Sequence, residues 1–177
     1  ASARSRRQPT AKPAIEVNWI HLLGSAIEIR STPITRAEYL QFVRETGRPA
    51  LYPGKASSGP ITGVSADDAM AFAEYYSQRD SWHYRLPTLE EMHTLALHTW
   101  DDVNWPARQQ EAINGPAQEY LDEWIGCSVD LSSQPDQLHC ITHPTWLLTN
   151  HQKLTCGALS DHGYSFVTFR LARSKQP

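Results

Sequence analysis

Three helix starts of one kind, all within the first hundred residues, constrain this fold more than any other feature of the sequence. Each start is a Ser or Thr followed three residues later by an acidic residue, as in Thr35-Arg36-Ala37-Glu38, Ser65-Ala66-Asp67-Asp68 and Thr88-Leu89-Glu90-Glu91. In such a capping box the hydroxyl accepts a backbone N–H, and the acidic side chain reaches back to the amide of the cap. We therefore predict three helices, with Thr35, Ser65 and Thr88 as structural capping residues.

The apolar residues behind each box predict which helix face is buried, because they recur at the three- and four-residue spacing of one helix side. The three stripes are Tyr39, Phe42 and Val43; Ala69, Phe72, Ala73 and Tyr76; and Leu89, Met92, Leu95 and Ala96. Gly47 follows the first stripe and predicts a left-handed helix stop at that point.

Strand patterns are fewer and shorter. Segments rich in β-branched and aromatic residues predict strands over residues 15–20, 26–29 and 166–171, and a short extended piece over 84–86. Between about Trp100 and Tyr164 no strong period occurs, and turn-forming residues alternate with scattered tryptophans. The sequence therefore predicts an α+β fold with an irregular second half.

The length and composition are those of one ordinary globular domain. The chain has 177 residues, 40% of them hydrophobic, which is enough for a single core. We predict one domain over residues 15–177, preceded by a disordered basic lead-in over residues 1–14. The net charge of −3 argues against a nucleic-acid partner. No apolar run reaches the roughly 20 residues of a membrane-spanning helix.

The first residue and the three cysteines give information on the cellular compartment in which the protein works. The chain begins with Ala1, which fits removal of a signal peptide and fits a trimmed chain equally well. Three cysteines, Cys127, Cys140 and Cys156, allow one disulfide and one thiol after export, or three thiols in the cytosol. The pairing and the oligomeric state stay open. We favour a bacterial periplasm or export over the cytoplasm.

Three ordered segments resemble known motifs. Residues 33–43 resemble P-V-T-N-A-E-Y-x-x-F-V, residues 60–69 resemble P-V-x-G-V-S-W-x-D-A, and residues 84–91 resemble Y-R-L-P-T-E-A-E-W. Two shorter segments, 122–124 and 169–173, resemble V-W-E-W and G-F-R-L-A-R. These motifs are similar to those of the formylglycine-generating-enzyme family, also called the sulfatase-modifying-factor family. The resemblance implies an irregular α+β fold of C-type-lectin-like kind with few strands.

The resemblance also suggests structural roles. Arg85 is expected to fasten a loop to carboxylates such as Glu123, and the alternative is a simple surface guanidinium. Trp124 is expected in the core. Arg170 falls in the closing motif and is expected to be structural too. Parts of the family bind calcium, so the resemblance admits calcium as a cofactor.

The family's enzymes bind copper(I) with two cysteines separated by four residues, which suits a soft ion. Here the corresponding stretch, from Trp146 to Phe169, contains Cys156 alone. His151 stands at the partner spacing upstream. We therefore expect no copper oxidase activity of the family's kind. The alternative is a divergent metal-dependent oxidoreductase in which Cys156 and histidines such as His151 bind the metal.

A non-catalytic member of this family is expected to bind another protein or a ligand. Relatives without the cysteine pair include accessory and regulatory proteins of bacterial secretion systems and ligand-displaying variable proteins. Loops on a rigid scaffold commonly carry recognition, so the candidate contact residues are Trp100, Trp105, Trp146 and Tyr164. The alternative for each aromatic side chain is that it holds its own loop together from inside.

Overall fold

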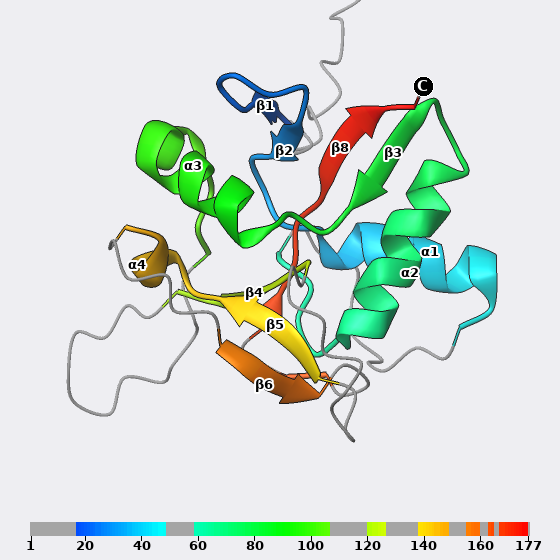
Figure 1. The fold of residues 1–177 in the computed structure, drawn as a ribbon. Coiled ribbons are helices and arrows are strands. Elements are labelled where there is room, and N and C mark those ends of the chain that lie inside the picture. The colour runs from blue at the N-terminus through cyan, green and yellow to red at the C-terminus, as the bar shows by residue number, and fades with distance from the viewer. Residues whose placement is uncertain are drawn as a thin grey trace, which may run out of the picture.

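Two four-stranded sheets, linked by the end of the chain, organise the described part of the molecule (Figure 1). The computed structural model describes residues 17–48, 59–106, 120–126, 138–148, 155–159, 163–164 and 167–176. The predicted lead-in over residues 1–14 lies outside these residues. Of the described helices, none has the length and apolar character needed to cross a membrane.

The first sheet is antiparallel and has the strand order β1-β2-β8-β3. Its strands are β1 (Trp19–His21), β2 (Glu28–Arg30), β8 (Ala172–Lys175) and β3 (Trp82–Arg85). The second sheet has the order β6-β5-β4-β7, with β4 and β7 parallel. Its strands are β6 (Thr155–Leu159), β5 (Leu138–Thr142), β4 (Asp122–Ile125) and β7 (Val167–Thr168).

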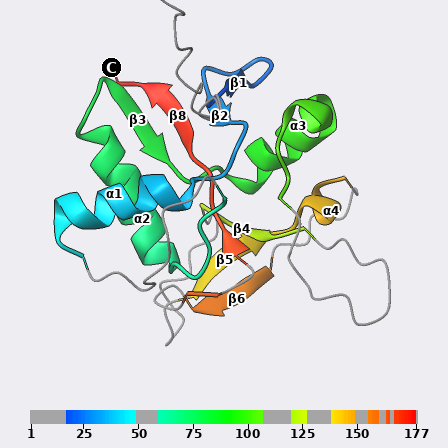
Figure 2. The same cartoon turned by 180° about the vertical axis from the view of Figure 1, so that it is seen from behind.

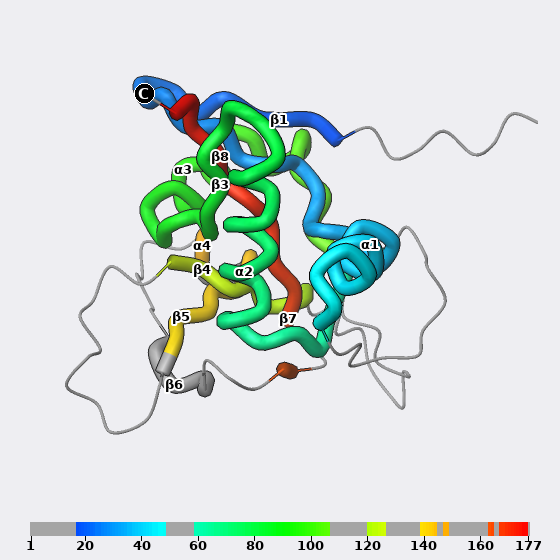
Figure 3. The backbone as a smooth tube through the Cα atoms, turned by 90° about the vertical axis from the view of Figure 1, so that its right-hand side faces the viewer, coloured from blue at the N-terminus to red at the C-terminus, as the bar shows by residue number. Residues whose placement is uncertain are grey.

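The strand predicted over residues 166–171 is not one strand, and this prediction is corrected. Residues 167–168 form β7 in the second sheet, and 172–175 form β8 in the first. Between them the Phe169 and Leu171 carbonyls accept hydrogen bonds from the N–H groups of Ile34 and Arg30, at 3.0 Å each. The apolar pattern of a buried crossing resembles that of a strand, so the sequence could not distinguish them. Figure 3 follows this red segment through the middle of the molecule.

The three predicted helices are confirmed as α1 (Arg36–Thr46), α2 (Ala66–Ser77) and α3 (Leu89–Thr99). Thr35 and Thr88 form complete capping boxes, and Ser65 accepts the Asp68 N–H. Gly47 has φ 69°, the predicted left-handed stop. The short helices η1 (Trp100–Asp102) and α4 (Pro144–Leu147) complete the described helical elements.

The helices pack on opposite flanks, as Figures 1 and 2 both show: α1 and α2 on one side and α3 on the other. One hydrophobic cluster joins the buried faces of α1 and α2 to Trp124 and Phe169. A second cluster joins α3 to Ile29, Ile125 and other residues of the sheets. Because successive strand residues point to opposite faces, Trp124 and Ile125 of β4 reach different clusters.

Candidate functional site

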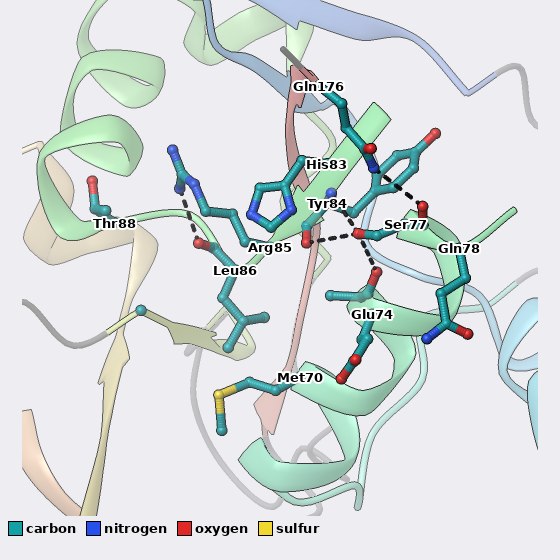
Figure 4. Close-up of a pocket in the computed structure, with 12 residues that line it drawn as sticks. Met70, Glu74, Ser77, Gln78, His83, Tyr84, Arg85, Leu86, Thr88 and Gln176 are labelled. Carbon is teal, nitrogen blue, oxygen red and sulfur yellow. Dashed lines mark hydrogen bonds between the residues drawn. The ribbon is translucent and has the colours of Figure 1, made fainter. Parts of the chain in front are cut away.

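A pocket between α2 and β3 is the candidate site, and we call it the α2–β3 pocket (Figure 4). Its volume is about 630 Å³. Met70 and Glu74 extend from α2, while Leu86 extends into the same space from the end of β3. The lining residues are Met70, Ala73, Glu74, Ser77, Gln78, His83, Tyr84, Arg85, Leu86, Thr88, Gly126 and Gln176.

The helical spacing of α2 creates one wall of the pocket. Residues four apart share a helix face, so Met70, Glu74 and Gln78 form one row. The opposite side of the helix buries Ala69 and Phe72 in the core, which fixes the orientation of this row. Met70 is 41% exposed, so a flexible thioether side chain lies uncovered at the pocket wall.

The outer edge of β3 forms a second wall, and side chains occupy its main-chain groups. The Trp82 N–H donates to Asp80 Oδ1 at 2.8 Å, and Gln176 Nε2 donates to the Trp82 carbonyl at 3.2 Å. The Tyr84 N–H donates to Ser77 Oγ at 2.8 Å, while that hydroxyl lies 3.3 Å from the Tyr84 carbonyl. Since Ser77 belongs to α2, these bonds fix the helix alongside the strand.

Arg85 lines the far end of the pocket, and its carboxylate partner is Glu91 and not Glu123, the example suggested by the sequence. Its Nη1 and Nη2 atoms donate to the two carboxylate oxygens of Glu91 at 2.6 and 2.7 Å, and Nη1 donates to the Leu86 carbonyl at 3.2 Å. Burial acts to raise the pKa of Glu91, but the bonds from Arg85 and Thr88 and the Arg85 charge lower it overall. Arg85 thus joins the end of β3 to the first turn of α3.

Glu123 pairs instead with Arg170, and both side chains are buried. Arg170 Nε and Nη2 donate to the Glu123 carboxylate at 2.6 and 3.0 Å. The same guanidinium donates to the carbonyls of Arg30, Ser31 and Asn104 at 3.2, 2.9 and 2.9 Å. The pair therefore connects β4 to the crossing segment and to two neighbouring loops.

The predicted contact residues Trp100 and Trp105 lie together, away from the pocket lining. Their ring centroids are 5.0 Å apart, and the two ring planes are inclined to each other by 27°. Trp105 is 9% exposed, and the Arg170 guanidinium lies 4.7 Å from its ring centroid. Trp100 also meets Tyr120 edge to face, at 5.9 Å. These contacts are those of aromatic side chains that hold their loops to the core.

Tyr164 lies in a different place, beside Trp124 at a centroid distance of 6.0 Å. Its carbonyl accepts the Gly63 N–H at 3.0 Å. The backbones cross so closely here that a Cβ on Gly163 would lie 1.9 Å from the Gly63 carbonyl oxygen. Trp124 in turn donates from Nε1 to the Val64 carbonyl at 3.0 Å. The side chain of Trp146 lies outside the described residues.

Of the predicted metal ligands, His151 lies outside the described residues, and Cys156 lies in β6, where the backbone alone is described. Within the described ranges, no group of three or more His, Cys, Asp or Glu side chains is arranged to hold a metal ion. Cys140 is disulfide-bonded, and its strand neighbour across the sheet is Cys156. For calcium, which the family resemblance admits as a cofactor, the same described ranges hold no such group of carboxylates.

Of the pocket residues, Arg85 and Thr88 were predicted, both in structural roles, and the others were not among the predicted site residues. A signal was present: Met70 stands between Asp67 and Glu74 on the polar side of an amphipathic helix, where a large apolar side chain is unexpected. The opposing wall of the pocket comes from β3, and the sequence pattern did not predict that α2 and β3 pack side by side.

Comparisons with known proteins give a family match and similarity to 21 chains of solved structures. The family model described as "Sulfatase-modifying factor enzyme 1-like domain" matches residues 17–144. The solved structure of PvdO from Pseudomonas aeruginosa superposes with a TM-score of 0.53 at 15% identity, covering 84% of this chain and 80% of that chain. No curated protein matches the sequence. The likeness confirms the predicted fold class, an irregular α+β fold of C-type-lectin-like kind.

Proposed function

Because the chain belongs to the family of sulfatase-modifying factor enzyme 1-like domains, we propose that it uses this fold to bind a ligand or protein partner without catalysis. The observation that carries the proposal is the α2–β3 pocket. Its volume of about 630 Å³ falls in the range of ligand sites, roughly 300–1,000 Å³. Apolar Met70 and Leu86 meet polar side chains there, the mixture that gives such sites both affinity and orientation.

The cysteine content supports a non-catalytic role. Cys156 is the single cysteine between Trp146 and Phe169, where the family's copper enzymes carry a pair. Two soft thiolates suit copper(I), and a single thiolate provides half of that ligand set. The scaffold motifs are kept while this pair is lost, which is the pattern of a binding module.

The compartment proposed with this function is an oxidising one. Disulfides persist in exported and periplasmic proteins and are rare in the cytosol, and Cys140 is disulfide-bonded. We therefore place the binding role outside the cytosol, as an accessory or regulatory module of a bacterial secretion or surface system.

The pocket can be tested directly with a fragment library and ligand-observed NMR. We expect fragments that bind the wild-type protein and lose binding in Met70→Glu. Leu97→Glu is the matched control, because Leu97 is also exposed on a helix, at 51%, and does not line the pocket. Absence of binding fragments, or equal loss in both variants, would contradict the proposed site.

Catalysis needs a separate test on the same protein. Oxygen consumption is measured with copper(I) and a cysteine-containing peptide, and we expect no turnover above buffer. Cys156→Ser should leave fragment binding unchanged. Oxygen uptake by the wild-type protein that disappears in Cys156→Ser would overturn the proposal and favour the divergent oxidoreductase.

A further inference from the structure

The charges on the wall of the α2–β3 pocket are unequally compensated. Four side chains on the wall can ionise: Glu74, His83, Tyr84 and Arg85. The Arg85 guanidinium is neutralised by Glu91 through two hydrogen bonds of 2.6 and 2.7 Å. Paired charges of this kind contribute little field to the neighbouring space, so Arg85 does not make the pocket an anion site.

Glu74 differs from Arg85 in this respect. No hydrogen bond or ion pair joins its carboxylate to any residue in the described part of the chain. The residues one turn away on α2 are Met70 and Gln78, and neither carries a positive charge. The pocket wall therefore carries one uncompensated negative charge.

The surroundings of Glu74 define the rest of a complementary ligand. Met70 and Ala73 lie beside it on α2, and Leu86 comes from the opposite wall. An apolar stem can pack against these side chains while a positively charged end remains at the carboxylate, as long cationic side chains do on protein surfaces. A carboxylate gives charge-assisted hydrogen bonds to an ammonium group.

From this arrangement we infer that the α2–β3 pocket binds a primary ammonium group on an aliphatic stem, with Glu74 as its counter-ion. A lysine side chain of a partner protein and a free alkylamine share this chemistry. The inference rests on the proposed binding function and adds the ligand class. An alkyl carboxylate is disfavoured at this wall, because it would place two negative charges together.

The two methionines of the chain provide a reporter and an internal control. Met70 lines the pocket, and Met92 is fully buried in the core. With ¹³C-labelled methyl groups, the full chain is titrated with Nα-acetyl-lysine N-methylamide and with its neutral counterpart, Nα-acetyl-norleucine N-methylamide. A third titration uses n-butylamine, which distinguishes a free amine from a peptide-borne one.

We expect the lysine probe to shift the Met70 methyl resonance, to leave Met92 unchanged, and to bind with a Kd about threefold lower than the norleucine probe. This size is typical of an exposed charge pair. Glu74→Gln should make the two affinities equal. Asp101→Asn removes an acidic side chain on η1 that lies outside the pocket lining and should preserve the preference.

The other outcomes separate the two proposals. Equal affinities of the lysine and norleucine probes for the wild-type protein would overturn the ammonium inference and leave the pocket as an apolar binding site. A lysine preference that survives in Glu74→Gln would also overturn it. If no probe shifts Met70, the inference fails, while the fragment screen with Met70→Glu still decides the binding function.

Discussion

Two opposite charges, Glu123 and Arg170, lie in the interior where the two sheets approach each other, with side chains 1% and 0% exposed. Burying an ion is costly unless the partner and the remaining hydrogen bonds are in place. Arg170 satisfies this condition with the Glu123 carboxylate and three main-chain carbonyls. The pair therefore ties folding of the second half of the chain to correct placement of the loop that begins at Arg30.

The first prediction concerns this pair. Glu123→Gln leaves the Arg170 charge buried without its counter-ion, and we expect the free energy of unfolding to fall by about 3–5 kcal/mol. Urea denaturation measures this change. The exposed pair between Arg48 and Asp68, with Arg48 41% exposed, is the control: Arg48→Gln should cost less than about 1 kcal/mol. Similar losses in both variants would show that the interior pair has no special role.

Threonine hydroxyls give a second prediction, because their surroundings differ. The Thr88 hydroxyl caps α3 and accepts the Glu91 N–H at 3.2 Å, so Thr88→Val should cost about 1 kcal/mol. Thr168 is fully buried, and its hydroxyl has no hydrogen-bond partner in the described residues. Thr168→Val keeps the shape and should leave the unfolding free energy equal or higher. A loss above about 1 kcal/mol in Thr168→Val would refute this expectation.

Single residues also show what the sequence could and could not predict. The caps at Thr35, Ser65 and Thr88 depend on neighbours three residues away, so local sequence was sufficient to predict them. For Arg85 the sequence suggested Glu123 as an example of a carboxylate partner. The observed partner is Glu91, which lies on the helix that follows Arg85 along the chain. The Glu123–Arg170 pair joins residues 47 positions apart, and nothing in a local pattern selects such a partner.

Among elements, the two loops that meet at Gly63 and Gly163 position the N-terminal end of α2. Gly63 has φ 77°, which favours glycine, and a Cβ on Gly163 would lie 1.9 Å from the Gly63 carbonyl oxygen. The contact holds the Tyr164 segment next to Trp124 in the described structure.

Gly163→Ala is the third prediction. Its methyl group would overlap the Gly63 carbonyl, and rigid backbone must move to relieve the overlap. We expect the free energy of unfolding to fall by more than about 2 kcal/mol, which is at the upper end of the effects of backbone strain. Gly24→Ala is the comparison, because Gly24 also has φ 77° but nothing within 4 Å of the position that its new methyl group would take, so its cost should be only about 1 kcal/mol.

The pairing of β5 with β6 leads to a fourth prediction. The register places Cys140 opposite Cys156, at a separation that suits a disulfide between neighbouring strands. We expect non-reducing peptide mapping of the native protein to show a Cys140–Cys156 cross-link and a thiol on Cys127. A Cys127–Cys140 cross-link would contradict this assignment and leave Cys156 as a thiolate for the metal-binding alternative.

For the whole molecule, the titration of buried groups sets the acid limit of stability. Burial acts to raise the pKa of Glu38, but the hydrogen bond and charge of Arg30 and the bonds from Thr35 lower it overall. Glu91 behaves in the same way beside Arg85 and Thr88. Burial lowers the pKa of His139, and this outweighs a backbone hydrogen bond and the charge of Asp67.

The fifth prediction follows from the signs of these shifts. All three pKa values are lower in the folded state, so the unfolded state takes up protons first and acid favours unfolding. The contribution of the neutral His139 side chain to the free energy of unfolding is complete above about pH 6.5 and is lost as the pH falls below that value. The contributions of the ionised Glu38 and Glu91 side chains to the free energy of unfolding are complete above about pH 4.5 and are lost as the pH falls below that value. Urea midpoints measured against pH should therefore fall in two stages.

His139→Gln is the control for the two-stage profile. This variant removes the titrating imidazole, so the decline between about pH 6.5 and 4.5 should become shallower while the steeper decline below pH 4.5 remains. An unchanged upper stage in His139→Gln would assign that stage to another group.

The outer edge of β3, whose main-chain groups already have hydrogen-bond partners, determines which part of a binding partner can be recognised at the pocket. Asp80, Ser77 and Gln176 already use the outward N–H and C=O groups of Trp82 and Tyr84. A visiting chain at the α2–β3 pocket therefore cannot be recognised by adding a strand to the sheet, which would accept almost any extended sequence. Recognition there must depend on the identity of a side chain, so one substitution in the partner is enough to weaken it while the partner's backbone stays unchanged.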